Sequence, residues 1–95
     1  MIVRIQGEGQ FELDDSVRSE LDRLDAELFR AIETGEAETF EAAVAAVERF
    51  IRAQGSEVPN ERLVPSDIIL PAPDTTLEEA KRLLTDEGYL TPVEV

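Results

Sequence analysis

The first 13 residues alternate apolar and polar positions in the pattern of two short strands, residues 1–5 and residues 10–13. The loop between them, residues 6–9, contains two glycines. A short glycine-containing loop between two such runs predicts a β-hairpin. Alternation places five apolar side chains on one shared face of this hairpin: Met1, Val3, Ile5, Phe11 and Leu13.

Two longer stretches carry apolar residues at helical spacing. The first predicts a helix over residues 16–33 that ends at Gly35, and the second predicts a helix over residues 37–53 that ends at Gly55. A connection this short forces the two helices into an antiparallel hairpin. The first stripe consists of Val17, Leu21, Leu24, Leu28, Ala31 and Ile32, and the second of Phe40, Ala43, Val44, Val47 and Ile51.

The last third of the chain predicts a short strand and a third helix. Residues 68–70 are apolar and lie between Pro65 and Pro71. Because proline cannot donate to a ladder, we expect a short strand at a sheet edge. A capping-box pattern at Thr76 and Glu79 begins a helix predicted over residues 76–87. These elements together predict one α+β domain over residues 1–95, with the β-hairpin packed on the helical hairpin.

Composition excludes several classes of function. The 95 residues include no cysteine and no histidine, which removes thiolate and histidine metal sites, disulfides and the Ser-His-Asp triad. The 22 acidic and 9 basic residues give a formal net charge of −13. Such a surface repels nucleic-acid phosphates and anionic lipid headgroups. No apolar run approaches a membrane span and the N-terminus lacks a signal-peptide pattern, so we expect a cytoplasmic protein without direct membrane insertion.

The remaining motifs favour structural roles. The glycines at positions 7 and 9 begin like a dinucleotide fingerprint, but Glu12 stands where the third glycine belongs. The adjacent carboxylates Asp14 and Asp15, like the other acidic pairs, point apart on a helix and indicate caps and a solvated face. We expect no cofactor and no catalytic residue; a weak Mg²⁺ or Ca²⁺ site stays open.

Phe29 and Phe50 lie on the predicted helices but off the centres of their apolar stripes. One interpretation is that both side chains reach over to cover the small β-hairpin. The other is that they form an exposed apolar edge that binds a partner, because aromatic residues are common anchors at interfaces.

The sequence resembles the PspAA family at both ends. The start, Met1-Ile2-Val3-Arg4-Ile5 followed by a Gly-Glu-Gly-Gln loop, is similar to the start of that family. The segment Leu63-Val64-Pro65-Ser66-Asp67 and the later Asp86-Glu87-Gly88-Tyr89-Leu90 resemble its C-terminal signature. Members often end in Gly-Leu-Ile-Pro, and this chain differs there. The family is named for its association with PspA, the coiled-coil protein of the phage-shock envelope-stress response.

The resemblance implies a non-enzymatic accessory or adaptor protein that binds or modulates a PspA-type coiled-coil protein and reaches the membrane only through that partner. The alternatives are an acidic protein that mimics DNA and inhibits a nucleic-acid-binding protein, or a small enzyme that uses carboxylates alone. The candidate partner-binding residues are Phe29 and Phe50. The next choice is residues 63–70, where a free strand edge would accept an added strand. Its candidate residues are Leu63, Val64, Pro65, Ser66 and Asp67.

Overall fold

A five-stranded mixed sheet with strand order β3-β2-β1-β4-β5 organises the molecule. The structure, a computed structural model, describes residues 1–85 and 88–92. β1 pairs antiparallel with β2 and parallel with β4. The chain leaves the sheet after β2, forms the helices, returns first as β3 beside β2, and then crosses to β4 on the other side of β1. The strands are β1 (Ile2–Ile5), β2 (Gly9–Glu12), β3 (Ser56–Glu57), β4 (Ile68–Leu70) and β5 (Thr91–Pro92).

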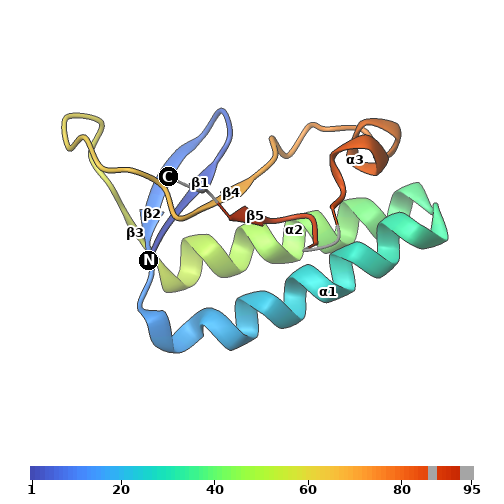
Figure 1. Cartoon of the computed structure of the whole chain (residues 1–95), viewed down its shortest axis with the longest axis horizontal. Helices are drawn as coiled ribbons and strands as arrows, with labels where there is room; N and C mark the ends of the chain where they lie inside the picture. The colour runs from blue at the N-terminus through green and yellow to red at the C-terminus, as the bar shows by residue number, and fades with distance from the viewer. Residues whose placement is uncertain (86–87, 93–95) are drawn as a thin grey trace.

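Two antiparallel helices cover one face of this sheet (Figure 1). A 3₁₀ turn, η1 (Asp15–Val17), leads into α1 (Arg18–Thr34), and α2 (Ala37–Gln54) follows almost at once. Gly35 ends α1 with a φ of 76°, and its N–H donates to the carbonyls of Ala31 and Ile32. The predicted glycine stop and the predicted helical hairpin are therefore confirmed.

The core lies between the sheet and the two helices. Val3, Phe11 and Ile68 stand side by side in the strand register and are all buried. They pack with the stripes of α1 and α2, which confirms the predicted arrangement of a β-hairpin on a helical hairpin. The most completely buried large side chains include Ile5, Leu13, Leu21, Leu28, Ile32, Val47, Ile51, Leu70 and Tyr89.

The third helix, α3 (Leu77–Leu83), begins with the predicted capping box between Thr76 and Glu79. The predicted end at residue 87 is wrong for the described residues, because Leu84 already has extended backbone. Thr85 and Gly88 exchange both backbone hydrogen bonds, at 3.1 and 3.2 Å, and form an isolated β-bridge. At these two residues the bridge takes the place of helical hydrogen bonds. Residues 86 and 87 lie outside the described residues.

The prediction of an edge strand at residues 68–70 is wrong. β4 lies inside the sheet, with β1 on one side and β5 on the other. The flanking prolines, Pro65 and Pro71, fall outside the three paired residues, so neither removes a ladder hydrogen bond. β4 therefore offers no free edge for strand addition. The outermost strands are β3 and β5, each two residues long.

Candidate interaction surface

The face of the sheet opposite the helices, called here the outer sheet face, carries Ile2, Arg4, Gln10, Glu12 and Ile69. Alternation along β1 and β2 puts these side chains outward, and Arg4 pairs in register with both Gln10 and Ile69. Part of this face is covered by residues 58–67, called here segment 58–67, which leads from β3 to β4 (Figure 1). Segment 58–67 includes all five of the second group of predicted partner-binding residues.

Three of those residues hold segment 58–67 in place. Gln10, the buried polar residue of the outer sheet face, donates from Nε2 to the carbonyl of Val64 at 2.9 Å and to Oγ of Ser66 at 2.8 Å. The Asp67 carboxylate accepts from the N–H of Ile2 at 2.7 Å. The N–H of Asp67 donates in return to the Ile2 carbonyl at 2.8 Å. Val64, Ser66 and Asp67 therefore have structural partners inside the protein.

Leu63 and Pro65 point to solvent instead. Leu63 is 93% exposed and Leu83 is 47% exposed; these are the exposed large apolar side chains of the described chain. Beside Leu63, Arg62 makes an exposed ion pair with Glu12 at 3.2 Å. This almost fully exposed leucine, on a backbone held by side-chain hydrogen bonds, presents apolar surface whose burial would be favourable.

The two predicted aromatic anchors differ from each other. Both Phe29 and Phe50 are partly exposed, but Phe50 packs against the core cluster. Phe29 does not belong to that cluster or to its described packing partners. It lies one helical turn after Asp25, on the flank of α1 that meets the C-terminal segment. The structure does not bring the two phenylalanines into one described contact.

Asp25 is the polar contact that sequence reasoning missed, since its position on the polar face of α1, opposite the apolar stripe, indicated a solvated side chain. Its Oδ1 accepts from the N–H groups of Tyr89 at 2.9 Å and Leu90 at 3.0 Å. Burial raises the pKa of Asp25, the two N–H donors oppose this change, and the nearby Asp22 adds to it. Gly88 has a φ of 116°, and a Cβ there would clash with the Asp25 carboxylate. The one indication of this contact in the sequence is Gly88, whose position is also typical of the end of the third predicted helix.

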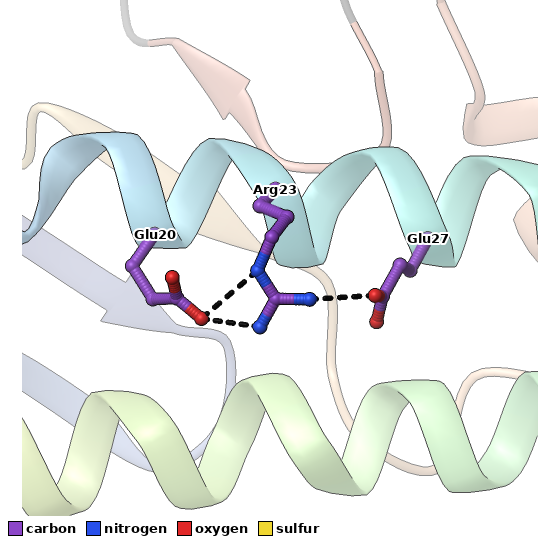
Figure 2. A network of polar contacts seen from close by, with 3 residues as sticks. All are labelled: Glu20, Arg23 and Glu27. Carbon is purple, nitrogen blue, oxygen red and sulfur yellow. Dashed lines mark hydrogen bonds and ion pairs between the residues drawn. The ribbon is translucent and has the colours of Figure 1, made fainter.

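Ion pairs interrupt the negative charge on α1. Figure 2 shows the Arg23 guanidinium between two carboxylates, donating from Nε to Glu20 at 3.0 Å and from Nη1 to Glu27 at 2.6 Å. These groups are about half exposed, so solvent screens each pair and its contribution to stability is small. In contrast, residues 31–48 around the tip of the helical hairpin contain five glutamates and no basic residue.

Two carboxylates of α1 share a small cavity, and the described residues hold no metal-binding cluster. Among them, no group of three or more acidic, histidine or cysteine side chains could hold a metal ion. Asp22 and Asp25 line one shared cavity, but its volume is about 50 Å³. Ligand pockets are usually about 300–1,000 Å³. Both carboxylates are also occupied, Asp22 by Arg18 and Asp25 by the backbone of residues 89 and 90.

These observations define a small acidic α+β protein. Its candidate binding features are the exposed Leu63, the partly exposed Phe29 and the acidic charge. Within the described part of the chain, no helix is both long enough and apolar enough to cross a bilayer. The model of the family described as PspAA, PspA-Associated protein, matches residues 1–92. The chain therefore belongs to the PspAA family, as the resemblance implied. Neither the curated proteins nor the solved structures contain a match to it.

Proposed function

We propose that this chain is a non-enzymatic accessory protein that binds a PspA-type coiled-coil protein and modulates it. The family match over residues 1–92 carries the proposal, because the family is named for its association with PspA. In this proposal the chain works in the cytoplasm and reaches the membrane only through its partner.

The small size of the cavity beside the one carboxylate with a raised pKa supports a binding role over catalysis there. The cavity at Asp22 and Asp25, about 50 Å³, holds only a few water molecules. Raising the pKa of one carboxylate is a feature of many acid catalysts. Here, however, the carboxylate in question accepts two backbone hydrogen bonds that fix the C-terminal segment. Its role in the proposal is structural.

We infer that Leu63 is the main apolar anchor, with Phe29 as a second candidate. Leu63 is 93% exposed, and burying a leucine side chain at an interface contributes roughly 1.5–3 kcal/mol. Phe50 has a smaller part in the proposal, because it already packs against the core. Val64, Ser66 and Asp67 support the anchor by holding its backbone on the outer sheet face, and Pro65 is exposed beside them.

Charge would guide the encounter. The net charge of −13 and the run of five glutamates in residues 31–48 favour a partner with a basic patch. The DNA-mimic alternative has less support, because Arg18, Arg23 and Arg52 each pair with carboxylates and interrupt the negative surface. A phosphate mimic needs an uninterrupted row of negative groups.

The test is the affinity of the purified chain for the PspA-type protein encoded in the same genome. Leu63→Ser should weaken binding by about tenfold or more, equivalent to about 1.4 kcal/mol. Leu83→Ser is the matched control, since Leu83 is the other exposed large apolar side chain. Phe29→Ala should weaken binding at unchanged stability, whereas Phe50→Ala should mainly lower the melting temperature.

Two results would contradict this account in different ways. If the wild-type chain shows no binding to the coiled-coil protein, the proposed function is wrong for this protein. If the wild type binds and the Leu63→Ser, Phe29→Ala and Leu83→Ser variants bind equally well, the function stands but both anchors are wrong.

A further inference from the structure

A small cavity lies on the outer sheet face, between the start of β2 and segment 58–67. Its volume is about 110 Å³, and Arg4, Gln10, Val58, Arg62, Leu63 and Val64 are among the residues that line it. The exposed Leu63 thus lines a hollow together with two arginines. The described lining includes no aspartate or glutamate.

This lining is opposite in charge to the rest of the molecule. Acidic residues outnumber basic ones by 22 to 9 in the chain, yet two of the nine basic side chains meet in this one cavity. Such a concentration leaves a local site for an anion on a surface that is otherwise strongly negative.

Of the two arginines, Arg4 gives the stronger evidence for an anion site. It is partly buried in the middle of β1, and its guanidinium makes no hydrogen bond or ion pair with any residue that the structure describes. Arg62, in comparison, has an exposed pair with Glu12 at 3.2 Å. A partly buried guanidinium with no anionic partner among the described residues is a group that can bind an external carboxylate.

We propose that the cavity binds a carboxylate side chain on an aliphatic segment of the partner protein. The guanidinium of Arg4 offers a planar pair of donors that matches a carboxylate. Val58, Leu63 and Val64 supply apolar contacts for a neighbouring aliphatic side chain. The volume suits one side-chain group, and the net charge of the chain disfavours a nucleic acid. The inference deepens the proposed function and rests on it for the source of the segment.

The test uses nuclear magnetic resonance and a probe that does not depend on the partner. The intact chain, labelled with ¹⁵N, is titrated with the acetylated, amidated peptide Leu-Glu-Ala-Leu-Glu, and in parallel with its glutamine counterpart Leu-Gln-Ala-Leu-Gln. The glutamate peptide should produce saturable shifts of the Arg4 Nε–H and the Gln10 side-chain amide at millimolar concentration, as expected of a weak single-site ligand. The glutamine peptide should bind at least about tenfold more weakly.

Matched variants separate the cavity from general charge effects. Arg4→Gln should remove the response, and Arg4→Lys should weaken it because lysine lacks the planar fork. Arg49→Gln makes the same charge change on exposed α2 and should leave the response intact. A melting curve of each variant reports whether the sheet has survived; if Arg4→Gln unfolds, the Arg4→Lys variant and the two peptides still decide.

Three outcomes would overturn the proposal. They are no saturable shift at Arg4 and Gln10, an equal response to both peptides, or binding of a short single-stranded oligonucleotide at this cavity in preference to the glutamate peptide. A peptide response without affinity for the PspA-type protein would refute the proposed function and leave the cavity assignment standing. Affinity for that protein without a peptide response would refute the cavity assignment and leave the proposed function standing.

Discussion

The parts of the chain before and after residue 55 both supply buried side chains to the core, but they differ in regular structure and in their dependence on polar contacts. Residues 1–54 form the β-hairpin and the helical hairpin, and they supply most of the buried apolar side chains. Residues 56–92 contain three very short strands and one helix of seven residues. Polar contacts from the first part fix their course: Gln10 holds Val64 and Ser66, and Asp25 holds Tyr89 and Leu90.

The proposed binding surface therefore lies in residues 56–92, the part whose course is fixed by contacts from residues 1–54. Segment 58–67 carries Leu63. The strands on which it lies, β1 and β2, belong to residues 1–54, called here the frame. Apolar burial therefore stabilises the frame, and a few side-chain hydrogen bonds decide how the anchor is presented. Substitutions of buried residues in the frame should therefore lower the free energy of unfolding of the whole domain. Substitutions at the contacts of segment 58–67 should have smaller and more local effects.

The largest effect is expected in the frame. Leu28 is completely buried between α1 and the sheet, so Leu28→Ala should lower the free energy of unfolding by about 3–5 kcal/mol through lost burial and the cavity left behind. Leu63→Ala, in the exposed loop, should change it by less than about 0.5 kcal/mol. Urea unfolding followed by circular dichroism measures both. Similar losses for the two variants would contradict the assignment of the core to the frame.

The next effect concerns the Asp25 contact. Asp25→Ala leaves the N–H groups of Tyr89 and Leu90 without their acceptor, and we expect a loss of about 2–3 kcal/mol. Asp25→Asn keeps an acceptor oxygen and should cost clearly less. Hydrogen exchange of the two amides reports the contact directly. Equal stability of the alanine and asparagine variants would show that the hydrogen bonds contribute little.

The pH dependence of this contact has a definite sign. Because burial raises the pKa of Asp25, the folded protein binds its proton more tightly than the unfolded chain does. The contribution of Asp25 to stability is therefore largest below its ordinary pKa and falls as pH rises through the raised value. The stability of the wild type relative to Asp25→Asn should fall as pH increases across this acidic range. A difference that increases with pH would mean that the two N–H donors outweigh burial.

A smaller effect on global stability than at Leu28 or Asp25 is expected at Gln10. Gln10→Ala removes two hydrogen bonds to segment 58–67, which should cost about 1–2 kcal/mol. Its main consequence should be local, with faster hydrogen exchange and proteolysis within that segment. Gln6→Ala, at an exposed position of the hairpin loop, is the control. If hydrogen exchange and proteolysis of segment 58–67 are unchanged in the Gln10→Ala variant, the conformation of the segment does not depend on the Gln10 hydrogen bonds.

Sequence reasoning succeeded where contacts repeat at a fixed local spacing. The stripes of α1 and α2, the stop at Gly35 and the capping box at Thr76 each depend on residues a few positions apart, and the structure confirms them. The β-hairpin is confirmed for the same reason, since its two strands are joined by a short loop.

It failed where the partner of a residue lies far away in the chain. β4 looked like an edge strand because of its prolines, but its neighbours come from residues 3–5 and 91–92. Asp25 looked solvated because its hydrogen-bond donors lie 64 and 65 positions later. Nothing in the sequence singles out Arg4. Its place in a cavity, with no ion-pair partner among the described residues, becomes visible only when the outer sheet face and segment 58–67 are brought together.

Hydrogen exchange of the intact chain, alone and mixed with the PspA-type protein from the same genome, tests the central claim most directly. The account predicts that binding slows exchange in segment 58–67 and in β1, around Leu63 and Arg4, in proportion to the amount of complex. Exchange that is unchanged throughout the chain, at partner concentrations well above those of the protein, would contradict the claim that this PspAA protein acts by binding that partner.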